Sequence, residues 1–309
     1  VPLCSRTPAS LSISLLGSGG VAELSRALAG RATHLAAQLT RLDVSDNRLG
    51  LHGGLAMAEL FKENDTLQDV CLSGNKLCDR VADGLAKALS KNETLTRLDV
   101  SHNKITGSIP NELTNLTKLQ VLYLQSNNLD GEMPVDIGNL KELRFLNGST
   151  NNISGSIPAS IGGLRDLQEL NFFENRITGE IPLSLGDLWN LRSLRFHDNE
   201  ITANISRFTT LGNLGRLVTL DFYNNKMVGD VPASIQNLTS LQYLYLQNEH
   251  YLPLRKKYCR QRLPNNGKYN YRIVRDEYVQ MMAMHCEDMH DTRFTFNSLQ
   301  ASSSYDATT

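Results

Sequence analysis

One nine-residue pattern recurs along most of the chain and limits its fold more than any other feature. The pattern is L-x-x-L-x-L-x-x-N, in which x is any residue and other residues replace a leucine in some copies. Its copies begin at Leu39, Leu67, Leu95, Leu119, Leu143, Leu167, Leu191, Leu217 and Leu241. By subtraction, successive copies start 28, 28, 24, 24, 24, 24, 26 and 24 residues apart. Self-similarity at such a period predicts a solenoid, in which each unit buries its apolar face against its neighbours.

The two halves of the pattern predict different structures. The alternation L-x-L predicts a short strand with one buried face, and parallel copies of it predict one curved sheet. The closing asparagine is expected to turn inward, where its amide satisfies backbone groups of the turn. We therefore interpret the closing asparagines as structural: Asn47, Asn75, Asn103, Asn127, Asn151, Asn175, Asn199 and Asn225.

The segments between the copies are of two kinds. "LGLHGGLAMAELFKENDT" and "LCDRVADGLAKALSKNET" each predict an amphipathic helix from the spacing of Leu55, Ala58 and Leu60 in one and Leu85, Ala88 and Leu89 in the other. From Ile105, segments such as "TGSIPNELTNL" carry a proline, which excludes a long helix and predicts a short second strand and a brief helical turn. "TANISRFTTLGNLGR" (202–216) lacks G-x-I-P and is expected to bulge. Backbone shapes that are costly for other residues are expected at Gly107, Gly131, Gly155, Gly179 and Gly229.

These features resemble the leucine-rich repeat family over roughly Leu39 to Glu249. The helical units resemble ribonuclease-inhibitor-type repeats, and the units from Ile105 resemble plant-type repeats, L-x-G-x-I-P-x-x-L-x-x-L. The resemblance implies an α/β solenoid with a curved parallel β-sheet on its concave face and helices, then short helical or extended segments, on its convex face. We expect a degenerate N-terminal repeat or cap (1–38), the solenoid (39–250), and a C-terminal cap or basic tail with disordered last residues (251–309).

In this fold the variable strand positions face the concave side, and they lie two, four and six residues after each anchor leucine. These residues are small or charged in the first three units, whereas aromatic residues appear from Tyr123 onward. Exposed aromatic side chains with polar neighbours indicate an interaction surface. The partner-binding residues predicted on this basis, called here the concave set, are Tyr123, Phe145, Asn147, Glu169, Asn171, Phe173, Arg195, His197, Asp221, Tyr223, Tyr243 and Tyr245. Two alternatives stay open: ordinary scattered surface aromatics, or a surface covered by the C-terminal tail.

After Leu246 the repeat stops, and the remaining sequence is of a different kind. From Arg255 to Arg275 there are eight Lys and Arg residues and no acidic residue. Interleaved tyrosines would suit an anionic partner, but no nucleic-acid motif accompanies them, so nucleic acid is disfavoured as a partner. The methionines Met281, Met282 and Met284 are expected on a helix that caps the last repeat.

Two kinds of chemistry are conceivable in this tail. Cys259, His285, Cys286 and His290 could ligate a metal, but their spacing matches no zinc pattern, and we expect neither a metal nor another cofactor. The tripeptide from Cys286 to Asp288 reads C-x-D and resembles the catalytic motif of bacterial leucine-rich-repeat ubiquitin ligases. That resemblance implies thiol chemistry at Cys286, although the catalytic domain of those ligases is far longer than this tail.

The bulk composition narrows the remaining classes. A net charge of −1 provides no global field for nucleic acid or membrane, and no apolar run is long enough to span a bilayer. Five scattered cysteines are too few for a disulfide scaffold. The resemblance to plant-type ectodomains implies paired cysteines that cap the solenoid; these are missing, and with the odd cysteine count this favours an intracellular location over secretion. We therefore predict a non-enzymatic recognition scaffold that binds a protein or peptide, not a small molecule, on its concave face. The alternatives are a ligand-binding fragment of a receptor-like protein and a ligase-like enzyme at Cys286.

Overall fold

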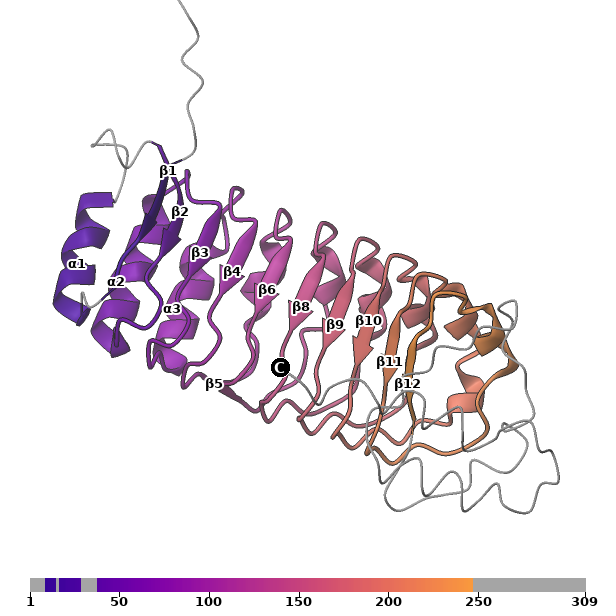
Figure 1. Ribbon diagram of the computed structural model, residues 1–309. Helices are drawn as coiled ribbons and strands as arrows, with labels where there is room; N and C mark the ends of the chain where they lie inside the picture. Colours follow the sequence, from indigo (N-terminus) through magenta and orange to yellow (C-terminus); the bar gives the residue numbers. More distant parts are fainter. Residues whose placement is uncertain (1–8, 15–16, 29–37, 247–309) are drawn as a thin grey trace, which may run out of the picture.

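The computed structural model describes residues 9–14, 17–28 and 38–246, which form one elongated solenoid (Figure 1). Within these residues ten strands pair in parallel into one sheet, in the order β1-β2-β3-β4-β6-β8-β9-β10-β11-β12. These strands are β1 Ala9–Ser12, β2 Leu39–Asp43, β3 Asp69–Cys71, β4 Arg97–Asp99, β6 Val121–Tyr123, β8 Phe145–Asn147, β9 Glu169–Asn171, β10 Ser193–Arg195, β11 Thr219–Asp221 and β12 Tyr243–Tyr245. From β2 onward each strand carries the first apolar residue of the predicted alternation, Leu or Val, and this residue is buried in β2 to β11, so the leucine-rich repeat fold is confirmed.

The face opposite the sheet changes from α-helices to 3-10 helices along the chain. The α-helices are α1 Gly17–Leu28, α2 Gly50–Glu63 and α3 Asp79–Leu89. The 3-10 helices are η1 Asn111–Asn115, η2 Ile137–Asn139, η3 Ala159–Gly163, η4 Leu183–Asp187, η5 Ile205–Arg207, η6 Thr209–Asn213 and η7 Ala233–Asn237. Four of these, η1, η3, η4 and η7, begin directly after a proline, which confirms the predicted short helical turns.

The helices α2 and α3 bury more than the sequence pattern indicated. Met57 and Phe61 of α2 are fully or almost fully buried, while Leu55, predicted to lie on the apolar stripe, is only partly buried. In α3, Val81 and Ala86 are buried, and Ala88 is partly buried. The predicted residues Ala58, Leu60, Leu85 and Leu89 are buried, and the apolar stripe is wider than predicted because both helices also pack on their neighbours in the row.

A second, minor sheet follows the main one where plant-type units begin. Strands β5 (Thr106–Gly107) and β7 (Asn128–Leu129) pair in parallel, and single bridges continue this ladder between later units, such as Glu132 with Ser154. Of the five glycines singled out in the sequence, Gly131 does not have the expected positive φ. There a Cβ atom would come within 2.6 Å of the Ser108 backbone, so close approach is the constraint on that glycine.

The segment 202–216 keeps the core continuous despite its missing G-x-I-P motif. It contains two successive 3-10 helices, η5 and η6, and it buries Phe208 between them at 2% exposure. The two extra residues of this unit are thus taken up as a further helical turn. Asn204 caps η5 by accepting a hydrogen bond from the Ser206 backbone N–H.

The closing asparagines form a ladder through the solenoid, as predicted. In one rung, Asn199 donates from Nδ2 to the carbonyls of Phe172 (2.9 Å), Phe196 (3.1 Å) and His197 (3.3 Å). Its Oδ1 accepts from the Ile177 N–H at 2.9 Å. Each such amide therefore joins the turns of adjacent units, which supplies partners to backbone groups that no strand pairing reaches.

A row of phenylalanines fills the core where the sequence has a glycine in place of an inward apolar residue. Phe172, Phe196 and Phe222 stack with ring centroids 5.8 and 5.6 Å apart. A Cβ atom at Gly148 would lie 2.5 Å from Phe172 Cε1. The glycine is therefore required by the larger ring that occupies its space in the next unit.

The ends of the solenoid are described to different extents. At the N-terminal end β1 pairs with β2, and α1 packs beside α2, in the region where the sequence suggests a degenerate repeat. At the other end, the basic stretch, the methionine-rich segment and the metal-capable or C-x-D residues lie outside the described residues. None of the described helices is long and apolar enough to cross a membrane.

Candidate partner-binding face

The sheet face that carries the concave set has the register predicted from the sequence. Residues two places after each anchor pair in one row, so that Phe145 faces Glu169 and Thr219 faces Tyr243. Residues four places after each anchor form a parallel row, in which Asn171 faces Arg195. Residues six places after each anchor form a third row in the turns, where backbone hydrogen bonds join adjacent units. One example is the bond from the Glu174 N–H to the His197 carbonyl, at 2.9 Å.

In the first three units of this face, the charged side chains form ion pairs with one another. Asp69 lies between two arginines, with its carboxylate oxygens 3.4 Å from Nε of Arg41 and of Arg97. Arg97 also reaches Asp99 at 3.3 Å, and Asp99 accepts hydrogen bonds from the backbone and the hydroxyl of Ser101. Opposite charges one strand apart thus compensate each other, which leaves little unpaired charge for a partner.

Tyr123 marks the end of this self-paired region. The guanidinium of Arg97 lies over the Tyr123 ring, 4.8 Å from its centroid, a cation–π arrangement. Tyr123 therefore belongs to the predicted set by position but already has an intramolecular partner on one face.

Beyond Tyr123 the concave set presents a mixed aromatic and polar surface. Glu169 and Arg195 are exposed and Asn171 is buried, while the remaining members are partly exposed: Tyr123, Phe145, Asn147, Phe173, His197, Asp221, Tyr223, Tyr243 and Tyr245. The set spans strands β6 to β12, so the structure brings all twelve residues onto one continuous face.

His197 is the centre of the most elaborate cluster on this face. Its ring stacks on Phe173 with centroids 4.5 Å apart and planes at 7°. Its Nδ1 lies 2.9 Å from Oδ2 of Asp221, an ion-pair distance, although the ring N–H does not point along that line. An open hollow of about 230 Å³ adjoins this cluster; it is lined by Arg195, His197, Thr219, Asp221, Tyr243 and Tyr245.

Several polar atoms on this face lack partners among the described residues. They are Gln125 Oε1, Asn171 Oδ1, Ser193 Oγ and His197 Nδ1, all of them on concave strand positions or the turn beside them. Burial also raises the pKa of the Tyr245 hydroxyl, and the nearby Asp221 carboxylate raises it further. Unsatisfied buried groups are costly unless water or a ligand pairs with them.

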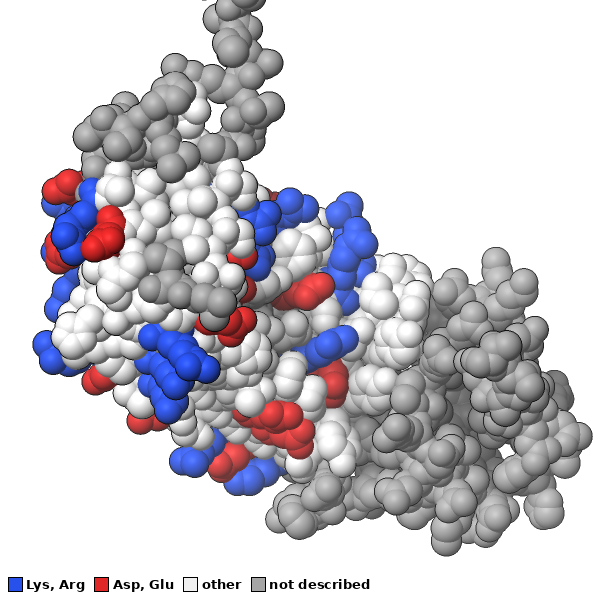
Figure 2. Space-filling view, turned by 60° about the vertical axis from the view of Figure 1, so that its left-hand side comes forward, with Lys and Arg blue, Asp and Glu red and all other residues white. Residues whose placement is uncertain are grey.

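Some residues of this region were not singled out from the sequence. Thr219 lines the hollow, and Ser193 is its neighbour on the adjacent strand. Neither was predicted, because the prediction rested on exposed aromatic residues and these side chains are short hydroxyls. Glu174 and Asp198 lie in the turns just beyond the strands, where they form a cluster with His197. The sequence could have indicated both residues, because each comes directly after a residue of the third row, Phe173 or His197. Figure 2 shows basic and acidic side chains interspersed over one side of the molecule, without a continuous field of either sign among the described atoms.

Family models match three stretches of the chain. A leucine-rich repeat region matches residues 76–207, and single leucine-rich repeats match residues 38–58 and 216–238. Together with the strand, turn and asparagine unit seen above, these matches show that the chain belongs to the leucine-rich repeat family. No curated protein matches the chain at a significant level.

Solved structures of the same fold include plant receptors. A TDR receptor is 33% identical and has a TM-score of 0.60; the alignment covers 68% of this chain and 35% of the receptor chain. The ectodomain of the Arabidopsis thaliana receptor kinase GASSHO1/SCHENGEN3, in complex with Casparian strip integrity factor 2, is 27% identical with a TM-score of 0.56; coverage is 68% and 30%. A plant ice-binding protein is 26% identical with a TM-score of 0.52; coverage is 68% and 64%.

The extent of these matches limits what they imply. The chain spans about a third of the two receptor chains, at 30% and 35% of their lengths. The same solenoid serves as a receptor ectodomain in one case and as an ice-binding protein in another, so the fold alone does not assign a function.

Proposed function

We propose that this protein is a non-catalytic recognition scaffold that binds an extended protein or peptide segment on the concave face between β8 and β12. The observation that carries the proposal is the contrast along one sheet. The first three units pair their charges with each other, whereas the later units present aromatic rings beside unpaired polar atoms. Tyrosine, arginine and other amphipathic side chains in such a setting are typical of binding hot spots.

The shape of the face favours an extended partner. Adjacent parallel strands lie about 4.8 Å apart, so a segment crossing β8 to β12 meets a new row of side chains at each strand. The hollow between β10, β11 and β12 would receive one of its side chains, with Tyr243 and Tyr245 as the apolar wall. The complex of GASSHO1/SCHENGEN3 with its factor supports the general type of interaction, since that receptor shares the fold.

A peptide-display selection on the full chain tests this proposal. Selected peptides are titrated against the wild type and against the double variant Tyr223→Ala/Tyr245→Ala by fluorescence anisotropy. We expect at least a tenfold weaker affinity, about 1.4 kcal/mol, because two ring contacts are lost. The melting temperature is expected to stay unchanged.

The matched control is Leu183→Ala/Trp189→Ala, which removes two exposed apolar side chains, 53% exposed each, that belong to the helical side of the solenoid. It should bind like the wild type. Equal affinity in the tyrosine variant, or an equal loss in the control, would remove the concave face from the proposal. A ubiquitin thioester that disappears in Cys286→Ala would instead support the ligase-like alternative.

A further inference from the structure

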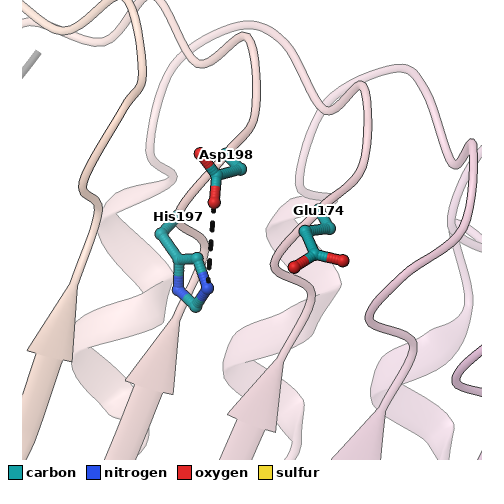
Figure 3. Close-up of side chains that lie close together, drawn as sticks. All are labelled: Glu174, His197 and Asp198. Carbon is teal, nitrogen blue, oxygen red and sulfur yellow. Dashed lines mark ion pairs between the residues drawn. The ribbon is translucent and has the colours of Figure 1, made fainter. Parts of the chain in front are cut away.

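The turns that follow β9 and β10 bring a histidine and two carboxylates together. The ligand atoms of Glu174, His197 and Asp198 all lie within 4.8 Å of one another. Nε2 of His197 is 4.0 Å from Oδ2 of Asp198 (Figure 3). In Figure 3 Asp198 stands over the imidazole on the same turn, and Glu174 approaches from the neighbouring turn. We propose that these three side chains form a binding site for a divalent transition-metal ion, with Zn²⁺ as the best fit.

The backbone presets the two carboxylates. Glu174 and Asp198 each occupy the position before a closing asparagine, where φ is positive, at 53° and 55°. The ladder bonds of Asn175 and Asn199 fix these turns from the inside. Two acidic residues are therefore held in adjacent units at equivalent positions, and a cation between them would offset their mutual repulsion.

Each proposed ligand is also held by a neighbour through its other atom. Asp198 Oδ1 accepts from Nδ2 of Asn224 at 2.7 Å, and Glu174 Oε2 accepts from the Thr150 hydroxyl at 3.1 Å. These contacts do not use Oδ2 of Asp198, which lies 4.0 Å from His197 Nε2, or Oε1 of Glu174, so one oxygen of each carboxylate is available to the ion. Outer contacts of this kind orient metal ligands and raise their affinity.

The histidine is buttressed independently of the acidic pair. Asp221 lies 2.9 Å from His197 Nδ1, its side chain is only 13% exposed, and it accepts the Tyr223 N–H at 3.1 Å. Phe173 stacks on the ring and fixes its plane. With Nδ1 facing Asp221 and Nε2 facing Asp198, Nε2 is the ring nitrogen on the side of the proposed ion, and a carboxylate behind the imidazole resembles carboxylate–histidine–zinc arrangements. The proposed site is therefore more than a cluster of surface acids.

The donor set selects the kind of metal. One imidazole and two carboxylates suit Zn²⁺ and related first-row ions, whereas Mg²⁺ and Ca²⁺ prefer oxygen ligands alone. Zinc ligands lie about 2.0–2.2 Å from the ion, so tetrahedral neighbours are about 3.4 Å apart. Closing the observed spacing to that value takes modest side-chain rotation, which the exposed Glu174 can supply. A water molecule would complete the tetrahedron.

Isothermal titration calorimetry of the chelator-treated full chain with ZnCl₂ tests the site. Because the chain also contains Cys259, His285, Cys286 and His290, the comparison is between variants of the whole chain. We expect His197→Ala and Glu174→Gln to lose one zinc equivalent or to bind it at least tenfold more weakly. Asp221→Asn, which keeps all three ligands, should weaken binding by about 10 to 100-fold.

His102→Ala is the control, because His102 occupies the left-handed turn position equivalent to that of Glu174, three units earlier, and among the described residues it belongs to no group of side chains that could hold a metal ion. It should retain the wild-type stoichiometry and affinity. The proposal is overturned if the wild type binds no zinc, or if His197→Ala binds it as the wild type does. Co²⁺ substitution gives a second readout: a sulfur-to-cobalt charge-transfer band that persists in His197→Ala would place the metal on cysteines instead.

Discussion

The asparagine ladder is open to a quantitative test at Asn199. In Asn199→Ala, the Ile177 N–H loses the side-chain acceptor that it has at 2.9 Å. The three carbonyls that Asn199 contacts each keep another donor: Asn175 for Phe172, Asn225 for Phe196, and the Glu174 N–H for His197. One buried donor is therefore orphaned, while the three acceptors lose only part of their bonding.

These contacts set the expected size of the effect. An orphaned buried donor costs about 1–3 kcal/mol, and the weakened acceptors add roughly 1 kcal/mol together. We expect Asn199→Ala to lower the free energy of unfolding by about 2–4 kcal/mol. Urea unfolding measures it, followed by far-UV circular dichroism and by the fluorescence of Trp189, the single tryptophan of the chain, which lies in the preceding unit.

A control of the same residue type separates the ladder from a general asparagine effect. Asn190 also bonds between units, to the Arg165 carbonyl at 3.0 Å and to Arg216 at 2.7 Å, but both contacts are exposed. Asn190→Ala should change stability by less than about 0.5 kcal/mol. A loss below about 1 kcal/mol in Asn199→Ala, or equal losses in both variants, would refute the view that buried backbone groups depend on the ladder.

Three further predictions follow from particular contacts. Gly148→Val should destabilise the chain by about 1–3 kcal/mol through its clash with Phe172, and Gly148→Val/Phe172→Leu should recover part of that loss in thermal melts; a silent single variant would contradict the close packing. Burial raises the pKa of the Cys71 thiol above its usual value, so at a given pH the folded chain holds less thiolate; peptide mapping should show slower iodoacetamide alkylation of Cys71 in the folded chain than in urea, and equal rates would contradict this. Lys118→Met removes the exposed ion pair with Glu142 and should leave the melting temperature unchanged, whereas a clear drop would show a larger role for that pair.

Much of the fold was predictable because the repeat fixes side-chain direction. The interval between anchor leucines sets which residues pair across strands, and the rows through Arg41, Asp69 and Arg97 follow from it directly. The proline in each plant-type unit likewise predicted where a helix must shorten. Other details depend on contacts between units: Gly131 is fixed by its distance to Ser108, and Gly148 by the Phe172 ring of the next unit.

In the candidate site, too, the sequence predicts the positions of residues better than their contacts. The positions of all twelve concave residues followed from the register, but their surroundings did not. That Arg97 lies over Tyr123, or that Asp221 approaches His197, depends on rotamers, which one sequence does not specify. The turn residues Glu174 and Asp198 were not predicted because the concave positions of the repeat end one residue earlier, at Phe173 and His197.

Under the proposed function, one sheet carries a self-paired region and a binding region without a change in its backbone. In the first units, acidic and basic residues alternate from strand to strand, and because neighbouring strands lie about 4.8 Å apart each charge can meet the opposite one. From β6 onward this alternation ends: Val121, Phe145, Glu169, Ser193 and Thr219 follow one another in the same row, and no pair among them is complementary in charge. The side chains of this row do not form ion pairs with one another, so under the proposed function they are available for contacts with a partner. The strands of both regions have the same parallel pairing, so the difference between the self-paired face and the proposed binding face rests on which residue types stand one repeat apart.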